Sequence, residues 1–426
     1  MSDLERQLEE LFMSDSRARR VDQVNVPAPR RSRFGGPMFV GGVAMAALAL
    51  IVAFSLLRGG PENVPASSPS PSGSAGVVAS PGPSASAAPS ASSGPGASNA
   101  PSPSAATGVR PDAQHGIITR GGPGGVVRTE ASATALTALK AFGGLAISKD
   151  GRRVAYVLKG ETAEQLRVFD TANPESQKTL LDVTSAGQSL GSVVWSSDGN
   201  DELLVQVDKR SSTDPLAVEF SSLRAVSVDT GTSREIVRTT TALLLPIVWH
   251  ASTNTGGVVE TGDGGYAISY DYLSGGTLKR SPLPQGQVGA FSIRSDVDGR
   301  RVLAIGPSIN APRGVMWWPF DKFEEKRDLK PADGWDVSSA YWRAGTDEIV
   351  VFASPPVKGP APRIEAWTTN DQRRTVAEGA GSLATVRTNG SAAITTSWNL
   401  VDLVTGAITP MPPGDGTQTP QFAVKF

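Results

Sequence analysis

The chain has 426 residues, with 40 lysines and arginines against 41 aspartates and glutamates, two histidines and no cysteine. A formal net charge of -1 gives no global basic field for nucleic acid. The lack of cysteine excludes disulfide scaffolds, thiolate zinc sites, iron–sulfur clusters and cysteine nucleophiles.

Residues 1–33 are predicted to be a cytoplasmic tail that contains a short amphipathic helix, from Asp3 to Arg20. A capping-box pattern opens it, and its apolar positions share one helical stripe: Leu4, Leu8, Leu11 and Phe12. Two interpretations remain open. The helix lies at the membrane interface or is only marginally stable in water, or it docks onto a cytoplasmic partner.

Residues 34–57 are predicted to form a single transmembrane helix. They include no charge over 24 positions, and a helix of that length covers about 36 Å, more than the roughly 30 Å hydrocarbon core. Arginines gather before the run and only Arg58 follows it closely, which predicts a cytoplasmic N-terminus and an extracytoplasmic C-terminal domain in the cell membrane. The long charged leader argues against a cleaved signal peptide.

Residues 58–110 are predicted to be a disordered linker rich in Ser, Pro, Ala and Gly. From Asn63 to Val109 there are 47 residues without a charge. Such a segment cannot bury enough apolar surface to offset the entropy of ordering. As a flexible coil it spans about 40 Å, which would hold the following domain away from the bilayer.

Residues 111–426 carry an internal repeat of strand, turn and strand. Ala146–Val157 contains an Asp-Gly turn, and Val194–Val205 repeats the pattern 48 positions later. Four more copies with less regular turns bring the number of units to six: 248–259, 292–304, 341–351 and 385–394. A third strand follows in each unit and a fourth in several, so the sequence predicts an all-β, six-bladed β-propeller.

One position in this repeat is always bulky and apolar. It lies at the end of each predicted inner strand: Ile147, Trp195, Trp249, Ile293, Trp342 and Val386. Three of the six are Trp, which could indicate an aromatic ligand platform. The alternation with Ile and Val indicates packing between blades instead.

The best copies of the repeat are ISKDGRRVAYV, residues 147–157, and WSSDGNDELLV, residues 195–205. This pattern resembles the TolB-like family of six-bladed, WD-repeat-like propellers over roughly residues 145–411. The full Gly-His and Trp-Asp signature of WD repeats is absent. The resemblance implies a binding or scaffolding surface and supplies no catalytic residue.

Three further patterns suggest chemistry that their context does not support. Gly187–Gly191 matches the GxSxG of serine hydrolases, but strand residues follow it and no hydrolase domain is present. The acidic turns 263–265 and 296–299 lack the remaining ligands of a calcium loop. His250 has no second histidine or carboxylate near it in sequence and is interpreted as a structural donor.

Trp317 and Trp318 are adjacent in a predicted strand, so they point to opposite faces, and Trp335 follows soon after. An aromatic contact site is therefore a further hypothesis. The mixed charges of residues 321–328 are interpreted as a solvated loop.

These features predict a membrane-tethered, extracytoplasmic propeller that binds a protein, peptide or envelope ligand. We expect no catalysis, cofactor, metal or nucleic acid, and the sequence assigns no binding residue. Two alternatives remain. The first is a transmembrane signalling regulator, because the layout resembles bacterial anti-sigma regulators. The second is a propeller hydrolase or lyase.

Overall fold

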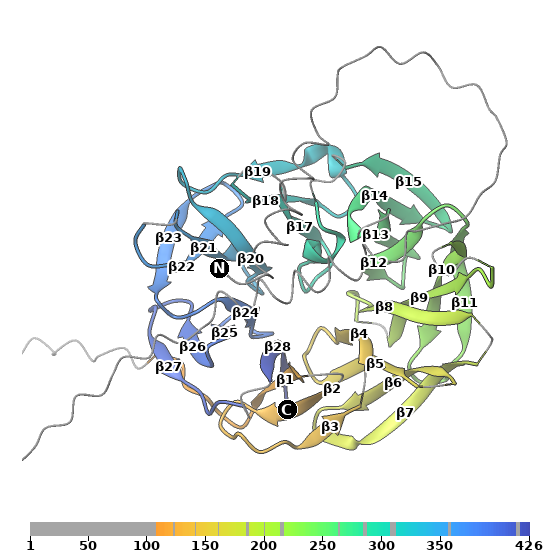
Figure 1. The fold of residues 1–426 in the computed structure, drawn as a ribbon, viewed down its shortest axis with the longest axis horizontal. Coiled ribbons are helices and arrows are strands. Elements are labelled where there is room, and N and C mark those ends of the chain that lie inside the picture. The colour runs from red at the N-terminus through yellow and green to blue at the C-terminus, as the bar shows by residue number, and fades with distance from the viewer. Residues whose placement is uncertain are drawn as a thin grey trace, which may run out of the picture. The chain divides into compact units, whose positions relative to one another are not determined.

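A computed structural model describes residues 108–426, except 122–123, 141, 161, 185–186, 200, 214–216, 263–264, 284–287, 307–311, 357–358 and 415–417. The described residues form seven four-stranded antiparallel sheets arranged around one axis (Figure 1). We number these sheets as blades 1 to 7 in chain order. The protein is thus an all-β propeller, as its repeat predicts.

Blades 1 to 4 run from the inner to the outer strand as follows. Blade 1 contains β28 (Thr419–Lys425), β1 (His115–Gly121), β2 (Gly124–Thr129) and β3 (Thr137–Leu139). Blade 2 contains β4 (Phe142–Ile147), β5 (Arg153–Lys159), β6 (Glu164–Asp170) and β7 (Asn173–Val183). Blade 3 contains β8 (Gln188–Trp195), β9 (Glu202–Arg210), β10 (Val218–Ser227) and β11 (Ser233–Thr239). Blade 4 contains β12 (Leu243–His250), β13 (Thr255–Thr261), β14 (Ala267–Ser274) and β15 (Thr277–Pro282).

Blades 5 to 7 follow the same order. Blade 5 contains β16 (Arg294–Ser295), β17 (Arg301–Gly306), β18 (Gly314–Pro319) and β19 (Arg327–Leu329). Blade 6 contains β20 (Asp336–Trp342), β21 (Glu348–Ser354), β22 (Arg363–Thr368) and β23 (Arg373–Glu378). Blade 7 contains β24 (Leu383–Val386), β25 (Ala392–Thr395), β26 (Asn399–Asp402) and β27 (Ile408–Pro410). Two short 3-10 helices, η2 (Ala290–Ser292) and η3 (Phe323–Glu325), lie before β16 and before β19.

The core is divided among the junctions between neighbouring blades. Seven clusters of buried apolar side chains occur in the described part of the chain, and each joins two adjacent blades. The cluster between blades 1 and 2, for example, combines Ile118 and Val127 with Tyr156 and Phe169. Both faces of every blade are therefore buried, which requires the ring to close.

The expected blade number of six is wrong, because the structure has seven blades. The six repeat units correspond to blades 2 to 7. Blade 1 combines three N-terminal strands with β28 from the C-terminus, and β28 pairs with β1 through partners such as Val424 and Gly116. Its first two strands are the two ends of the fold, so no Asp-Gly turn joins them and the repeat pattern does not reveal it.

The repeated Ser-x-Asp-Gly turn has a simple hydrogen-bonding basis. In blade 2 the Ser148 hydroxyl donates to Asp150 over 2.6 Å and accepts from the Arg153 backbone N–H over 2.9 Å. Gly151 adopts a φ of +77°, which residues with a Cβ rarely adopt. Blade 3 repeats the Ser-to-Asp bond with Ser196 and Asp198 over 2.5 Å. The motif locks the link between the first and second strands.

The packing role predicted for the bulky inner-strand position is confirmed. Trp195, Trp249, Ile293 and Trp342 are buried in four different junction clusters. Ile147 and Val386 are half-buried against two others. None of the six is an exposed aromatic platform, because each side chain fills the space between neighbouring sheets.

The predicted tail, transmembrane helix and most of the linker lie outside the described residues. Within the part of the chain that the structure covers, no helix has the length and apolar character needed to cross a membrane.

Substitution of Gly199 tests the positive φ of this turn without a steric clash. Its φ is +86°, and a Cβ built there meets no atom within 4 Å, so only backbone strain opposes a side chain. We expect Gly199→Ala to lower the free energy of unfolding by about 1–2 kcal/mol. Urea unfolding followed by tryptophan fluorescence measures this change. A variant as stable as the parent would contradict the positive φ.

Candidate functional site

The links between strands divide the propeller into two faces. We call the side with the first-to-second strand links the turn face; its links are 148–152, 196–201, 251–254, 296–300, 343–347 and 387–391. The opposite side, which carries the second-to-third strand links and the links between blades, is called the loop face. The two faces differ in chemistry.

On the turn face an ion pair spans the propeller axis. Lys149 Nζ of blade 2 lies 2.7 Å from Asp298 Oδ1 of blade 5, three blades away around the ring. The hydrogen bond from Lys149 lowers the pKa of Asp298. Gly299 next to this carboxylate approaches Ser197 of blade 3, and its carbonyl accepts a hydrogen bond from His250. These turns of blades 2, 3, 4 and 5 therefore meet near the propeller axis on the turn face.

The chain also enters the propeller on the turn face. The Val109 backbone N–H donates to Asp402 Oδ2 over 2.9 Å, and Arg387 donates to the Arg110 carbonyl over 3.0 Å. Burial raises the pKa of Asp402, but N–H donors from Thr405 and Val109 outweigh it, so this pKa lies below its usual range. The segment that precedes β1 is thus fixed to blade 7.

Four side chains, which we call the closure cluster, join the two ends of the fold. They are Asp112 and His115 before and within β1, Glu130 after β2, and Arg387 after β24. Arg387 Nε donates to Glu130 Oε1 over 2.9 Å and its Nη2 pairs with Glu130 Oε2, while His115 Nδ1 lies 3.0 Å from Asp112. Glu130 is fully buried and Arg387 nearly so.

The closure cluster has the ligand types of a metal site but not the charge balance. Possible ligand atoms of Asp112, His115 and Glu130 lie within 4.8 Å of one another. However, Arg387 occupies both oxygens of Glu130, and its positive charge would repel a cation. Burial raises the pKa of Glu130, against the opposing effect of Arg387. We interpret the cluster as a structural ion pair that closes the ring.

The loop face carries an exposed apolar surface over blades 4 and 5. It consists of Tyr266, Ile268 and Phe291, and Phe291 is 78% exposed. Tyr266 forms a β-bridge with Gly289, and the Phe291 ring lies 3.8 Å from the Cβ position of Gly265. Tyr266 and Phe291 therefore come from two links of the loop face that contact each other, and Ile268 lies at the adjoining end of β14. We call them the loop-face surface.

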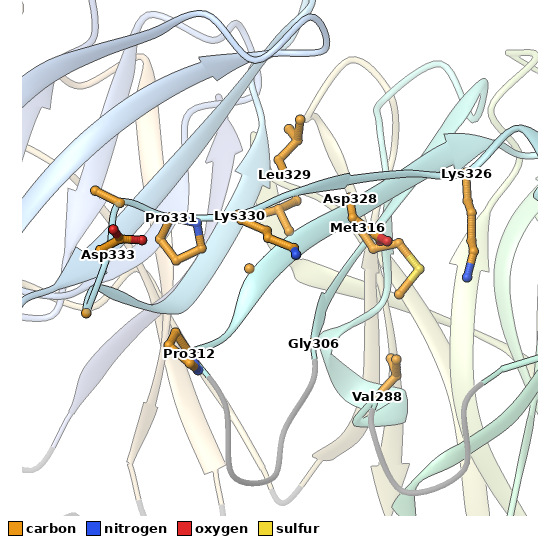
Figure 2. A pocket seen from close by; sticks show the side chains of 14 residues that line it. Val288, Gly306, Pro312, Met316, Lys326, Asp328, Leu329, Lys330, Pro331 and Asp333 are labelled. Atoms are coloured by element: carbon orange, nitrogen blue, oxygen red, sulfur yellow. The ribbon is translucent and has the colours of Figure 1, made fainter.

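A cavity of about 430 Å³ lies beside this surface (Figure 2). Its apolar walls include Val288, Val315, Met316 and Leu329, and Val288 accepts a hydrogen bond from Ala267, between Tyr266 and Ile268. Four charged side chains also line it: Lys326, Asp328, Lys330 and Asp333. The volume falls in the range of about 300–1,000 Å³ that is common for ligand pockets.

A second cavity, of about 470 Å³, lies on the turn face next to Asp298. Two of its three arginines have ion-pair partners, because Arg301 pairs with Asp296 and Arg343 with Glu348. This arrangement stabilises the turns of blades 5 and 6 and leaves the loop-face cavity as the stronger candidate.

The sequence motifs with suspected chemistry lie apart from each other. Ser189 of the GxSxG pattern lies near the loop-face end of β8 and pairs with Asp208. Both histidines lie on the turn face and are hydrogen-bonded elsewhere, His115 to Asp112 and His250 to Gly299. The described residues thus bring no histidine to Ser189, and no triad forms there.

The acidic turn 296–299 is the hairpin turn between β16 and β17. Asp296 Oδ1 accepts the backbone N–H groups of Arg300 and Arg301 over 2.7 and 3.1 Å. Of the other acidic turn, only Gly265 is described. The mixed-charge segment 321–328 contains η3, and Phe323 packs on Trp318 with ring centroids 5.1 Å apart.

The hypothesis of an aromatic contact site at Trp317 and Trp318 is wrong. Trp318 is fully buried, and Trp335 is also buried, below the guanidinium of Arg363. Trp317 is half-buried and packs edge-on against Trp342. Both sides of β18 face a neighbouring blade. Side chains on opposite faces of this strand, such as Trp317 and Trp318, therefore both pack against another sheet.

Sequence reasoning missed the loop-face surface. Phe291 lies two residues before the bulky inner-strand position Ile293, so the sequence pattern assigns it to the next strand. The pattern likewise assigns Tyr266 to the start of β14. Only contact between the two links shows that these residues share one exposed patch. The cavity lysines lie in a segment that has the composition of an ordinary solvated loop.

No protein-family model and no curated protein matches the sequence. Solved structures do resemble it. Oligogalacturonate lyase from Vibrio parahaemolyticus is 12% identical with a TM-score of 0.46, over 69% of this chain and 89% of the lyase. Acylaminoacyl peptidase from Pyrococcus horikoshii is 14% identical with a TM-score of 0.47, over 71% of this chain and 51% of the peptidase, and TolB from Acinetobacter baumannii is 15% identical with a TM-score of 0.40, over 65% of this chain and 66% of TolB. The chain thus spans about half of the peptidase. At these identities the likeness concerns the fold alone.

The closure cluster makes a sharp stability prediction. Arg387→Met removes the partner of buried Glu130 and should cost about 3–5 kcal/mol of unfolding free energy. The double variant with Glu130→Gln should recover part of that loss, because no buried charge then remains. All eight tryptophans lie between residues 195 and 398, so urea unfolding followed by their fluorescence reports on the propeller.

The matched control is Arg238→Met, which removes a half-exposed pair with Glu235 and should cost no more than about 1 kcal/mol. Equal losses in the two arginine variants would contradict the special role of the closure cluster.

Proposed function

We propose that the protein is a tethered, non-catalytic binding module that holds a protein or peptide ligand on the loop face of its propeller. The observation that carries this proposal is the loop-face surface, where three large apolar side chains lie exposed next to a cavity. Exposed apolar clusters of this kind are typical of interaction sites. Phe291, the most exposed of the three, would gain most from being covered.

The distribution of features between the two faces supports this choice. The turn face receives the chain at Val109 and is crossed by the Lys149–Asp298 pair. Its exposed apolar side chains Val404 and Ile408 flank Ala407, which lies against Gly108 of the entering segment. The loop face lies opposite that entry point and opposite the Lys149–Asp298 pair.

The chemistry of the described residues favours binding over catalysis. Buried Glu130 is held in a structural pair with Arg387, and neither histidine lies near a nucleophile. Propellers of similar shape include a lyase and peptidases as well as TolB, so the fold does not choose between these activities. The signalling alternative depends on residues 2–33, outside the described part.

The tether is proposed to be a single membrane span at residues 34–57, with an extracytoplasmic propeller on the linker 58–110. The uncharged run and the preceding arginines support this arrangement. In intact cells, a membrane-impermeant reagent should label a tag after Phe426 and not a tag before Met1. Labelling at Met1 alone would reverse the proposed orientation.

Site-specific photo-crosslinking tests the binding face. With p-benzoylphenylalanine at position 291 of the full chain, irradiation of intact cells should give one dominant adduct, and Ile268→Asp in the same chain should reduce it several-fold by placing a charge in the apolar surface. Position 404 on the turn face is the matched control. Adducts at 404 but not at 291 would place binding on the other face, and adducts at neither would contradict a binding module.

A further inference from the structure

The segment that lines the cavity has two distinct sides. In β19, Arg327 and Leu329 pair with Trp317 and Val315 of β18, and Leu329 is buried with Val315 between blades 5 and 6. Asp328 pairs with Met316 instead. Successive strand residues alternate in direction, so Asp328 lies on the side opposite Leu329.

Lysines lie at both ends of this short strand. Lys326 and Lys330 flank β19 and extend on the same side of it as Met316 (Figure 2). Both are exposed, and no described carboxylate forms an ion pair with either. Asp328 lies between them, so this edge of the cavity carries two positive charges around one negative charge. This edge alone thus has one net positive charge, whereas Asp333 balances the lining as a whole; the Lys326 ammonium also lies 5.6 Å from the centre of the Phe323 ring.

The remaining lining completes a site with three kinds of chemistry. The walls are apolar at Val288 and Met316, and Asp333 supplies a second carboxylate at the blade 6 side. A ligand that contacts the apolar walls, the lysines and the aspartates together needs an apolar body, a negative charge and N–H donors, respectively. A peptide carries all three groups, since its backbone supplies N–H donors at every residue other than proline.

We infer that the cavity binds an extended segment of a partner protein in which a large apolar side chain lies next to an acidic residue. The apolar side chain enters between Val288 and Met316, and the carboxylate lies between Lys326 and Lys330. The flanking chain then crosses the loop-face surface, because Val288 is bonded to Ala267 between Tyr266 and Ile268. This inference rests on the proposed function, for which it names the ligand chemistry.

Fluorescence anisotropy with the full chain tests this inference. The probe is a labelled, terminally blocked peptide, Gly-Glu-Leu-Phe-Glu-Gly, and matched probes replace both Glu by Gln, both Glu by Lys, or Leu-Phe by Ala-Ala. We expect the acidic apolar probe to bind most tightly. The Lys326→Gln, Lys330→Gln double variant should weaken it about tenfold and abolish its advantage over the Gln probe, with a smaller dependence on salt.

Lys322→Gln is the matched control, because Lys322 lies in the same segment but is paired with Glu325. It should leave affinity unchanged. Tighter binding of the Lys probe, or an equal effect of the control, would overturn the inference. So would efficient competition by inorganic phosphate, which would indicate a simple anion site.

The result also separates this inference from the proposed function. Suppose that Phe291→Ala weakens binding of the probes but the lysine double variant does not. The loop face then binds peptides without recognising a carboxylate, and only the inference fails. If no probe binds while position 291 still forms its adduct in cells, the inference again fails alone. If there is neither binding nor an adduct, both fail.

Discussion

Each sheet of this protein has two apolar faces, and only neighbouring sheets are available to cover them. That constraint explains the seven junction clusters and the bulky inner-strand residues that fill them, such as Trp249 between blades 3 and 4. It also explains why the ring must close, since an open row of sheets would leave two faces in water. Closure in turn removes most free strand edges.

The closing junction is built differently from the other six. Blade 1 takes its inner strand from the C-terminus, and two buried arginines bind across the joint: Arg387 to Glu130, and Arg128 to the Pro412 carbonyl over 2.5 Å. A buried charge destabilises the fold unless it is well paired. These contacts therefore favour the specific packing of blade 1 against blade 7 over nonspecific contact between apolar surfaces. The junction between the chain ends is where such specificity is needed most.

The short turns also determine where function can lie. Ser-x-Asp-Gly links are compact and internally hydrogen-bonded, and on the turn face they converge near the axis, where Lys149 meets Asp298. The links of the loop face are longer and less regular, so they can present side chains that the fold itself does not use. Phe291 and Lys330 are of this kind, whereas Lys326 lies at the end of the link that leads from β18 into β19; none of the three fills a junction between blades.

The propeller fold is compatible with binding and with catalysis, and the distinction depends on which side chains converge. In the described part of this chain the polar groups with strong mutual contacts are in structural roles, whereas the charged side chains that line the loop-face cavity form no ion pair with a described residue. A surface with unpaired lysines, exposed aromatic rings and apolar walls is suited to recognition. Its geometry supplies no general base next to a nucleophile.

The sequence by itself determined the strand-and-turn repeat, the identity of blades 2 to 7 and the packing role of positions such as Trp195 and Trp342. These features are local, because a turn motif and a period-2 pattern lie within a few residues of each other. Tertiary structure alone decided blade 1, whose strands β1 and β28 are separated in sequence by the other six blades. It also decided the Glu130–Arg387 pair and the contact of Tyr266 with Gly289, since proximity between distant segments arises only when the ring closes.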